Sequence, residues 1–453
     1  MDLSGKRTIE DLYFITGLIL LLAAMLFGIT GALQYIVPGF LKESISFEKT
    51  RPLHVSSAVF WIILAASGSL LSGLNKSGQN KTSFSLSVAQ LLFFVTGIVF
   101  ILFSYLKGEF GGREYWEFPP VYAILIVTGW ICMLVNFLKS IGSLKKRPVY
   151  VWMWLTGLLS FLFTYIESYL WLIPYFRSSI VNDMTIQWKS YGSMVGSWNM
   201  IIYGSSIFLL ERITGSDKYS RSSLAFAMYF LGLFNLMFNW GHHIYTLPTA
   251  TYIKYISYSV SMTELIILAR IIYLWKRSLS EKQKSFHILS YRFLWAADIW
   301  ILFTLLLAIL ISIPAVNIYT HGTFVTVAHT MGATIGINSM LLLAVIIHQA
   351  GQKCEPLNMK RVNFGYYIMN ISLGIFVMSL LGAGVGKAIW QMSGSPLPFR
   401  EMMKGLRPWF LLFFISGITL FAGTMLVAFP LLKVYFRCNV RHSMRKWNVI
   451  ANG

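Results

Sequence analysis

The sequence predicts an all-α membrane protein that forms one domain with twelve membrane-spanning helices. Three observations support this fold class. Of the 453 residues, 56% are hydrophobic, only 12% are charged, and the apolar residues fall into long runs. A soluble chain of ordinary composition carries about twice that charged fraction. About 20 apolar residues cross a bilayer as a helix, and twelve runs in this chain reach or approach that length.

The twelve predicted spans follow one another with short connections, so no soluble module separates them. They cover residues 13–37, 54–74, 84–106, 121–138, 151–173, 191–210, 223–247, 252–274, 293–313, 322–348, 362–389 and 409–434. The polar stretch 1–11 leads directly into the first span and lacks the pattern of a cleavable signal peptide. We therefore expect residues 1–453 to form a single polytopic domain.

The distribution of basic residues predicts the orientation of these spans. A net charge of +20 is also typical of nucleic-acid binding, but the basic residues concentrate in the loops on one side of the twelve-span arrangement. Residues 145–147, 276–277 and the tail 437–446 belong to that side. The positive-inside rule then places both termini in the cytoplasm. We expect an anionic lipid surface as the partner of this charge, and no nucleic acid.

Four of the eight histidines lie in apolar runs at one predicted depth. His54 begins the second span at its outer end, and the adjacent pair His242 and His243 lies near the outer end of the seventh. His329 lies about seven residues into the tenth span, or ~10 Å deep at 1.5 Å per residue. An intramembrane imidazole needs a partner. The shared depth favours metal or haem ligands over four separate helix-packing histidines.

The tenth span contains two further candidate residues. Met331 is two residues from His329, so the two side chains would point about 200° apart and one helix could serve two haems. Ligation by one histidine and one methionine raises the potential of an electron-transfer haem. The alternative for Met331 is core packing, since the chain has 20 methionines. His321 caps this span on the outside and is expected to contact an anionic group.

These residues occur in motifs that resemble the haem-copper oxidase superfamily, most closely the catalytic subunit of cytochrome-c-type nitric oxide reductases. The matching motifs are Arg51-Pro-Leu-His54, Gly112-Arg-Glu-Tyr-Trp-Glu117, Gly241-His-His243, Ser261-Met-Thr-Glu264, and Tyr319-Thr-His-Gly-Thr323 leading to Ala328-His329. The resemblance covers nearly the whole chain, with twelve spans in the same order. It implies a bundle like subunit I of that superfamily, placed in a bacterial cytoplasmic membrane.

The resemblance also implies the histidine ligands. His54 would ligate a low-spin haem b and His329 a high-spin haem b. His242 and His243 would bind a non-haem metal that faces the high-spin haem, and in this branch that metal is iron.

Three glutamates match family positions as well. Glu264 matches a glutamate near the non-haem iron that is linked to the metal or to proton delivery. Glu114 and Glu117 fall where the family places a calcium ion that bridges haem propionates. The alternative is a solvated outer loop, which we expect for at least one of these two residues.

Three departures from the family pattern concern the metal sites. Met331 stands where the family has a second axial histidine, which predicts His54 and Met331 as the ligands of the low-spin haem. The sixth span, Tyr191-Gly-Ser-Met-Val-Gly-Ser-Trp-Asn-Met-Ile-Ile-Tyr203, lacks the family's third histidine and its glutamate. Asn199 lies about eight residues into that span, or ~12 Å, and is either an oxygen ligand suited to iron or part of an interhelical hydrogen bond. The tyrosine that oxygen reductases have four residues after a sixth-span histidine is also missing.

The resemblance implies reduction of two NO molecules to N2O, with Glu264 and Asn199 as candidate catalytic residues. The sequence contains no Cys-x-x-Cys-His motif, so the expected electron donor is a cytochrome c subunit or a soluble cytochrome c. Two alternatives remain open. One is dismutation of NO to N2 and O2. The other is an electron-transfer or NO-sensing haem protein whose second metal site is inactive.

Overall fold

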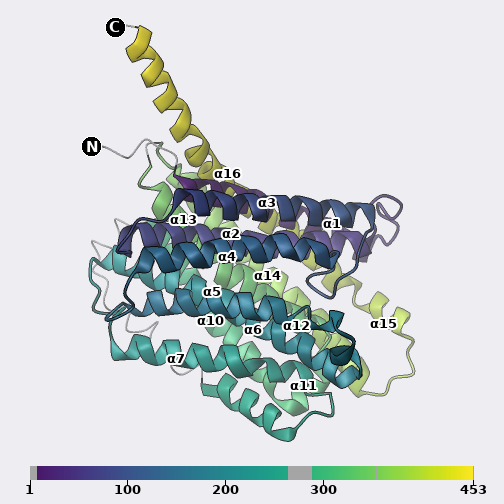
Figure 1. Ribbon diagram of the computed structural model, residues 1–453. Coiled ribbons are helices and arrows are strands. Elements are labelled where there is room, and N and C mark those ends of the chain that lie inside the picture. Colours follow the sequence, from purple (N-terminus) through teal and green to yellow (C-terminus); the bar gives the residue numbers. More distant parts are fainter. Residues whose placement is uncertain (1–7, 264–287, 354, 452–453) are drawn as a thin grey trace.

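The computed structural model describes residues 8–263, 288–353 and 355–451. They form a bundle of long, roughly aligned helices (Figure 1). The only β-type pairing within these residues is one isolated bridge between Arg113 and Trp116. The predicted all-α fold class is therefore confirmed.

The helices follow the predicted spans in order. Eleven segments of the described residues are long and apolar enough to cross a membrane. The first six contain α1 (Ile9–Ile36), α2 (Phe47–Ser77), α3 (Phe84–Lys107), α4 (Ala123–Ile141), α5 (Val149–Glu167) and α6 (Ile180–Thr214). The next are α7 (Ser223–Phe238) with the 3₁₀ turn η4 (Asn239–Ile244), and α10 (Ile288–Ser312). The tenth predicted span comprises α12 (Phe324–Met331), the π-helical η5 (Gly332–Ser339) and α13 (Met340–Ala350); α14 (Met359–Met392) and α16 (Arg407–Ala451) follow.

The shorter elements connect these helices at the bundle ends. They are η1 (Pro120–Tyr122), η2 (Leu170–Leu172), η3 (Pro174–Arg177), α11 (Pro314–Thr320) and α15 (Phe399–Gly405). The eighth predicted span, 252–274, is helical over 251–263, and its remainder lies outside the described residues. The structure thus agrees with eleven of the twelve predicted spans and leaves the eighth incomplete.

Ion pairs place the beginning of α1 and the later part of α16 at the same end of the bundle. Lys353 Nζ donates to Asp11 Oδ2 at 2.7 Å, and the pair is largely buried. Arg437 lies 3.6 Å from Glu355, two residues further along the same loop. The loop after α13 therefore contacts both helices. This is expected if the chain crosses the bundle an even number of times between the start of α1 and the end of α16.

Two spans are not the uniform α-helices that the sequence predicts. The α-helical part of the seventh span ends at Phe238, and the histidine pair lies on the tighter turn η4. Side chains stabilise this change: Ser257 donates to the carbonyl oxygen of Asn239, and Ser261 donates to the Asn239 amide oxygen. In the tenth span, η5 follows Met331 directly. Short π-helical segments frequently occur at functional sites.

Candidate functional site

The four intramembrane histidines come from three parts of the bundle. His54 lies seven residues into α2, and His329 lies five residues into α12. At 1.5 Å per residue these positions are ~10 Å and ~8 Å from the helix starts. His242 and His243 lie on η4. The structure therefore places His54 and His329 at similar distances from the starts of their helices.

A backbone or amide oxygen holds Nδ1 in three of these imidazoles. Nδ1 is 2.7 Å from the carbonyl oxygen of Ala24 in His54, 3.0 Å from Oδ1 of Asn239 in His242, and 3.3 Å from the carbonyl oxygen of Thr304 in His329. These oxygens accept, so each Nδ1 donates and the neutral ring keeps a lone pair on Nε2. Histidine ligands are oriented in this way in metal and haem sites.

The same four histidines are only partly accessible to solvent. All four are surrounded by protein atoms, yet each keeps an intermediate accessible surface. The unengaged Nε2 atoms of His54 and His329 fit axial ligation of haem.

The adjacent histidines form a compact pair against α6. The ring centroids of His242 and His243 are 4.2 Å apart. His243 stacks on Trp188 of α6, with centroids 5.1 Å apart and planes 14° from parallel. Two imidazole ligands place their nitrogens about 2 Å from a shared ion, and the ring spacing of this pair is compatible with that arrangement.

His329 and His321 lie close to the pair. His329 is within electrostatic range of both His242 and His243. The His321 ring centroid is 6.4 Å from that of His243 and 6.2 Å from that of Trp188. Burial lowers the pKa of His321, and the nearby Glu114 carboxylate opposes that shift. This end of the bundle therefore brings four candidate histidines into one neighbourhood, namely His242, His243, His321 and His329.

No complete cluster of metal ligands is found in the part of the chain that the structure describes. Within it, no three His, Cys, Asp or Glu side chains lie close enough together to hold an ion. Glu264, the predicted additional ligand, lies outside the described residues. Among the described residues, His242 and His243 are therefore the two metal ligands that can be assigned to this site.

The structure does not bring Asn199 to the histidine pair. A Cβ at Gly192 would lie 2.7 Å from Cβ of Trp240, and one at Gly196 would lie 3.0 Å from Cα of Leu236. These contacts fix the antiparallel register of α6 and α7. They place Asn199 level with about residue 233, nine residues and ~14 Å from His242 along the axis.

The predicted depth of Asn199 fails because α6 begins earlier than expected. Ser179 caps the helix, which starts at Ile180 rather than at the predicted residue 191. Asp183 in the added first turn pairs with Arg113 at 2.8 Å, and these polar turns extend the helix beyond the predicted span. The Asn199 amide oxygen is buried without a hydrogen-bond partner, so the alternative of an interhelical hydrogen bond through that atom is not observed either.

Met331 ends α12 and packs against the hydrophobic core with an intermediate accessible surface. Its α-helical connection to His329 preserves the predicted divergence of about 200° between the two side chains. Core packing and an orientation away from His329 are both present, so the two interpretations of Met331 remain compatible with its position.

An ion-pair cluster lies just outside His54. Arg51 donates to Glu114 at 2.6 Å and to Glu117 at 2.8 Å, one helical turn before His54. Burial raises the pKa of Glu117 despite the opposing effect of Arg51, and Oε2 of Glu117 is buried without a hydrogen-bond partner. The Glu117 side chain is only 14% exposed, whereas that of Glu114 is 38% exposed, so a solvated position for at least one of the two stays a prediction. Carboxylate oxygens suit calcium, although Arg51 engages one oxygen of each carboxylate.

Two features of the site had no usable signal in the sequence. Trp188 stacks on His243, but nothing distinguishes it from the other 14 tryptophans. Glu167 at the end of α5 forms an ion pair with Lys189, the residue after Trp188. Both arise from the register of α6 against its neighbours, which the sequence pattern does not specify.

The comparisons with known proteins agree on one family. Residues 8–419 match the family model for cytochrome c and quinol oxidase polypeptide I. The chain is 23% identical to a nitric oxide reductase subunit of Stutzerimonas stutzeri, over 92% of this chain and 93% of that relative. It is 22% identical to a cytochrome c oxidase subunit 1 homolog of Azorhizobium caulinodans, over 90% and 78% of the two chains. A heme-copper terminal oxidase dimer solved by cryo-EM has the same fold, with a TM-score of 0.73 over 95% of this chain and 84% of that chain at 14% identity.

Proposed function

The chain belongs to the cytochrome c and quinol oxidase polypeptide I family, within the haem-copper oxidase superfamily, and we propose that it reduces nitric oxide to nitrous oxide. Membership of this superfamily makes it an oxidoreductase of a bacterial inner membrane that uses haems and metal centres. The choice of nitric oxide as substrate is the step that we propose.

The observation that carries the proposal is the cluster formed by Arg51, Glu114 and Glu117. The Gly-Arg-Glu-Tyr motif that contains Glu114 resembles the reductase branch, and the structure folds it onto Arg51, three residues before His54. Similarity to a nitric oxide reductase subunit over nearly the full length of both chains supports the same branch.

We propose His54 and Met331 as ligands of a low-spin haem b, and His329 as the ligand of a high-spin haem b. His242 and His243 would bind a non-haem iron, with Glu264 beside it. When bound, these groups would supply electrons and Lewis acidity to two NO molecules held close together.

The protein itself has three tasks in this scheme. Hydrogen bonds from Nδ1 orient the imidazoles of His54, His242 and His329. The Trp188 ring covers one face of His243 and limits water there. Glu264 is the proposed proton carrier, because a positioned carboxyl group can accept and release protons as a general base and acid. A cytochrome c subunit or soluble cytochrome c is the proposed electron donor, as family membership suggests.

A second candidate function is supported by the surface of α6 that faces the histidine pair. Trp188 and Gly192 lie at that level, and neither provides a metal ligand. A site with fewer ligands is compatible with an electron-transfer or NO-sensing haem protein whose second metal site is inactive. Altered ligands are also the reason to consider dismutation of NO to N2 and O2.

Gas analysis combined with metal analysis distinguishes these functions. We would purify the full chain with its native partners, measure non-haem iron per haem, and add isotopically labelled NO with an electron donor. Nitric oxide reduction predicts about one non-haem iron for two haems and labelled N2O as the product. His243→Ala is the control and should abolish both the iron and the N2O. Release of O2 would favour dismutation, and parent protein without non-haem iron or gas product would contradict the proposal.

A further inference from the structure

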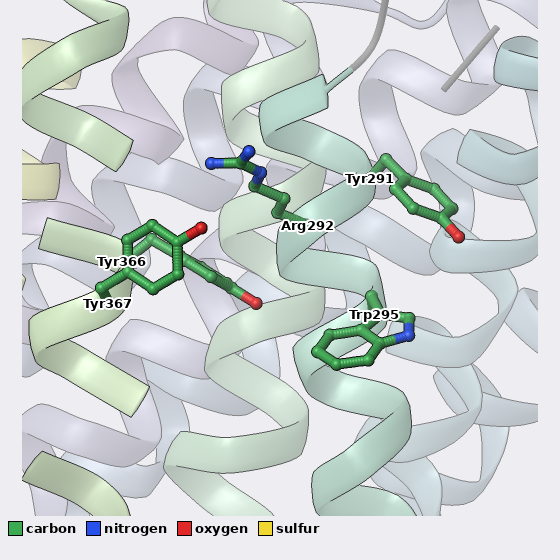
Figure 2. Close-up of a pocket in the computed structure, with 5 residues that line it drawn as sticks. All are labelled: Tyr291, Arg292, Trp295, Tyr366 and Tyr367. Carbon is green, nitrogen blue, oxygen red and sulfur yellow. The ribbon is translucent and has the colours of Figure 1, made fainter. Parts of the chain in front are cut away.

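An aromatic pocket lies between α10 and α14, far from the histidines. Tyr291, Arg292 and Trp295 of α10 line it together with Tyr366 and Tyr367 of α14, and its volume is about 280 Å³ (Figure 2). The three α10 residues lie in the first two turns of that helix. Neither the histidine site nor the proposed reaction uses these side chains.

The register of α10 locates this pocket at the end of the bundle where the α1 and α16 contacts lie. A Cβ at Gly332 would meet Thr304, and one at Gly336 would meet Trp300, so α10 runs antiparallel to the tenth span. On this register, residues 291–295 of α10 lie level with about residues 341–345 of α13, toward the end of the bundle that contains the Lys353–Asp11 ion pair. The positive-inside rule predicts that this end faces the cytoplasm.

Arg292 provides positive charge to the pocket. Its Nη1 donates to the amide oxygen of Asn363, and its guanidinium carbon lies 5.7 Å from the ring centroid of Tyr367. The Asn363 amide is uncharged, so this hydrogen bond orients the guanidinium of Arg292 without neutralising its charge. Arg361 and Lys360 are exposed in the first turn of α14, and neither lines the pocket.

The pocket opens on the outer surface of the bundle. Trp295 is 41% exposed and Tyr367 is 48% exposed. One turn deeper on the same helix faces, Ile299 is 43% and Ile371 is 64% exposed. Tryptophan and tyrosine are enriched at the membrane–water interface, and the isoleucines continue the surface as an apolar track into the membrane.

We propose that this pocket binds the phosphate group of an anionic phospholipid, whose acyl chains lie along Ile299 and Ile371. A guanidinium matches a phosphate with two parallel hydrogen bonds, and the rings of Trp295 and Tyr367 pack against the glycerol region. Free phosphate shares the headgroup chemistry but has no apolar tail to bury on the track. A lipid is therefore the ligand that satisfies both halves of the site.

The position of the pocket argues against a redox ligand. Thr304, whose carbonyl oxygen accepts from His329, is twelve residues beyond Arg292 on α10. That separation is ~18 Å along the helix axis. The pocket and the candidate haem ligands thus lie in different parts of the membrane, as expected for a lipid contact rather than an electron donor.

Native mass spectrometry of the delipidated full chain tests the proposal. The protein would be titrated with phosphatidylglycerol, with phosphatidylcholine, and with inorganic phosphate as a competitor. We expect phosphatidylglycerol to bind at least tenfold more tightly than phosphatidylcholine and to resist millimolar phosphate. Arg292→Gln should remove that preference. The matched control Arg361→Gln makes the same change of charge in the first turn of α14, outside the pocket lining, and should keep the preference.

The conservative variant Arg292→Lys keeps the charge and removes the planar fork, so we expect intermediate affinity for phosphatidylglycerol. Parental preference in Arg292→Gln would overturn the proposal, as would equal loss in Arg361→Gln. Full displacement by millimolar phosphate would identify a general anion site and would also overturn it. If Arg292→Gln loses haem, the Lys variant supplies the decisive comparison: affinity equal to that of the parent would contradict recognition by the guanidinium fork.

Discussion

Replacing Gly28 with alanine should displace His54 and reduce occupancy of the low-spin haem. A Cβ at this position of α1 would lie 2.9 Å from Nδ1 of His54 and 3.0 Å from Cε1. Ordinary contacts begin near 3.4 Å, so the imidazole must move by about half an ångström. It cannot do so freely, because its Nδ1 donates to the carbonyl oxygen of Ala24, one turn earlier, at 2.7 Å.

The size of the effect follows from how tightly a ligand must be placed. A displacement of ~0.5 Å is the limit that a preorganised site tolerates, and loss of the group that orients a ligand typically weakens metal affinity ~10- to 100-fold. Alanine is also a better helix former than glycine by about 1 kcal/mol. The thermal stability of the protein can therefore stay level or rise while haem is lost, which makes haem content the decisive measurement.

Haem per protein and the reduced absorption spectrum would be measured for Gly28→Ala during dilution in detergent. We expect the low-spin component to fall at least tenfold in apparent affinity while the high-spin component remains. Gly31→Ala is the matched control on the same helix, because its Cβ would meet Thr50 Cγ2 at 3.4 Å, an ordinary contact. Parental low-spin occupancy and an unshifted spectrum in Gly28→Ala would refute the role of His54 as a haem ligand held from Nδ1.

Three further predictions concern the other predicted ligands and the outer cluster. His242→Ala or His243→Ala should remove non-haem iron but keep both haems, since the haem ligands lie on other helices; loss of haem with iron retained contradicts the assignment. Met331→Leu should abolish a His/Met charge-transfer band in near-infrared magnetic circular dichroism. A bis-histidine spectrum in the parent protein would rule out Met331 as a haem ligand. Burial raises the pKa of Glu117 above its usual 4.5, with Arg51 opposing. The protonated carboxyl is thus favoured in the folded state, and its stabilisation is present below pH 4.5 and is lost as pH rises through the raised pKa. The melting temperature would be measured against pH in the presence of a chelator. It should show this decline in the parent protein but not in Glu117→Gln. Identical slopes for the two proteins would refute the role of Glu117.

The membrane fold could be predicted from the sequence because it depends on composition along the chain. A helix that crosses a bilayer must satisfy its backbone hydrogen bonds internally and needs an apolar segment of nearly fixed length. Those two requirements are local, so the runs that contain α1, α3 and α14 could be located without knowing their neighbours. The exact helix starts could not. The first turns of α6 are polar, and they are helical because Ser179 caps them and Asp183 pairs with Arg113.

The candidate ligands could also be predicted from local sequence. The residues that surround them could not be predicted. An imidazole in an apolar run is unusual enough to stand out, so His54, His242, His243 and His329 could be identified by position alone. The family resemblance added their possible roles. Neither source indicated that Trp188 would stack on His243, because that contact depends on the register of α6 against η4.

The sequence by itself therefore determined that this protein is a helical membrane bundle with a group of histidines near one face. Tertiary structure decided which residues meet: Nδ1 of His54 at the carbonyl of Ala24, Trp188 at the histidine pair, and Asn199 some 14 Å away from it. The physical reason is that hydropathy is summed along one segment, whereas the register between two helices is set by close contacts at single residues. A shift of one turn moves a side chain by about 5 Å, enough to make or remove a ligand without changing the hydropathy of either helix.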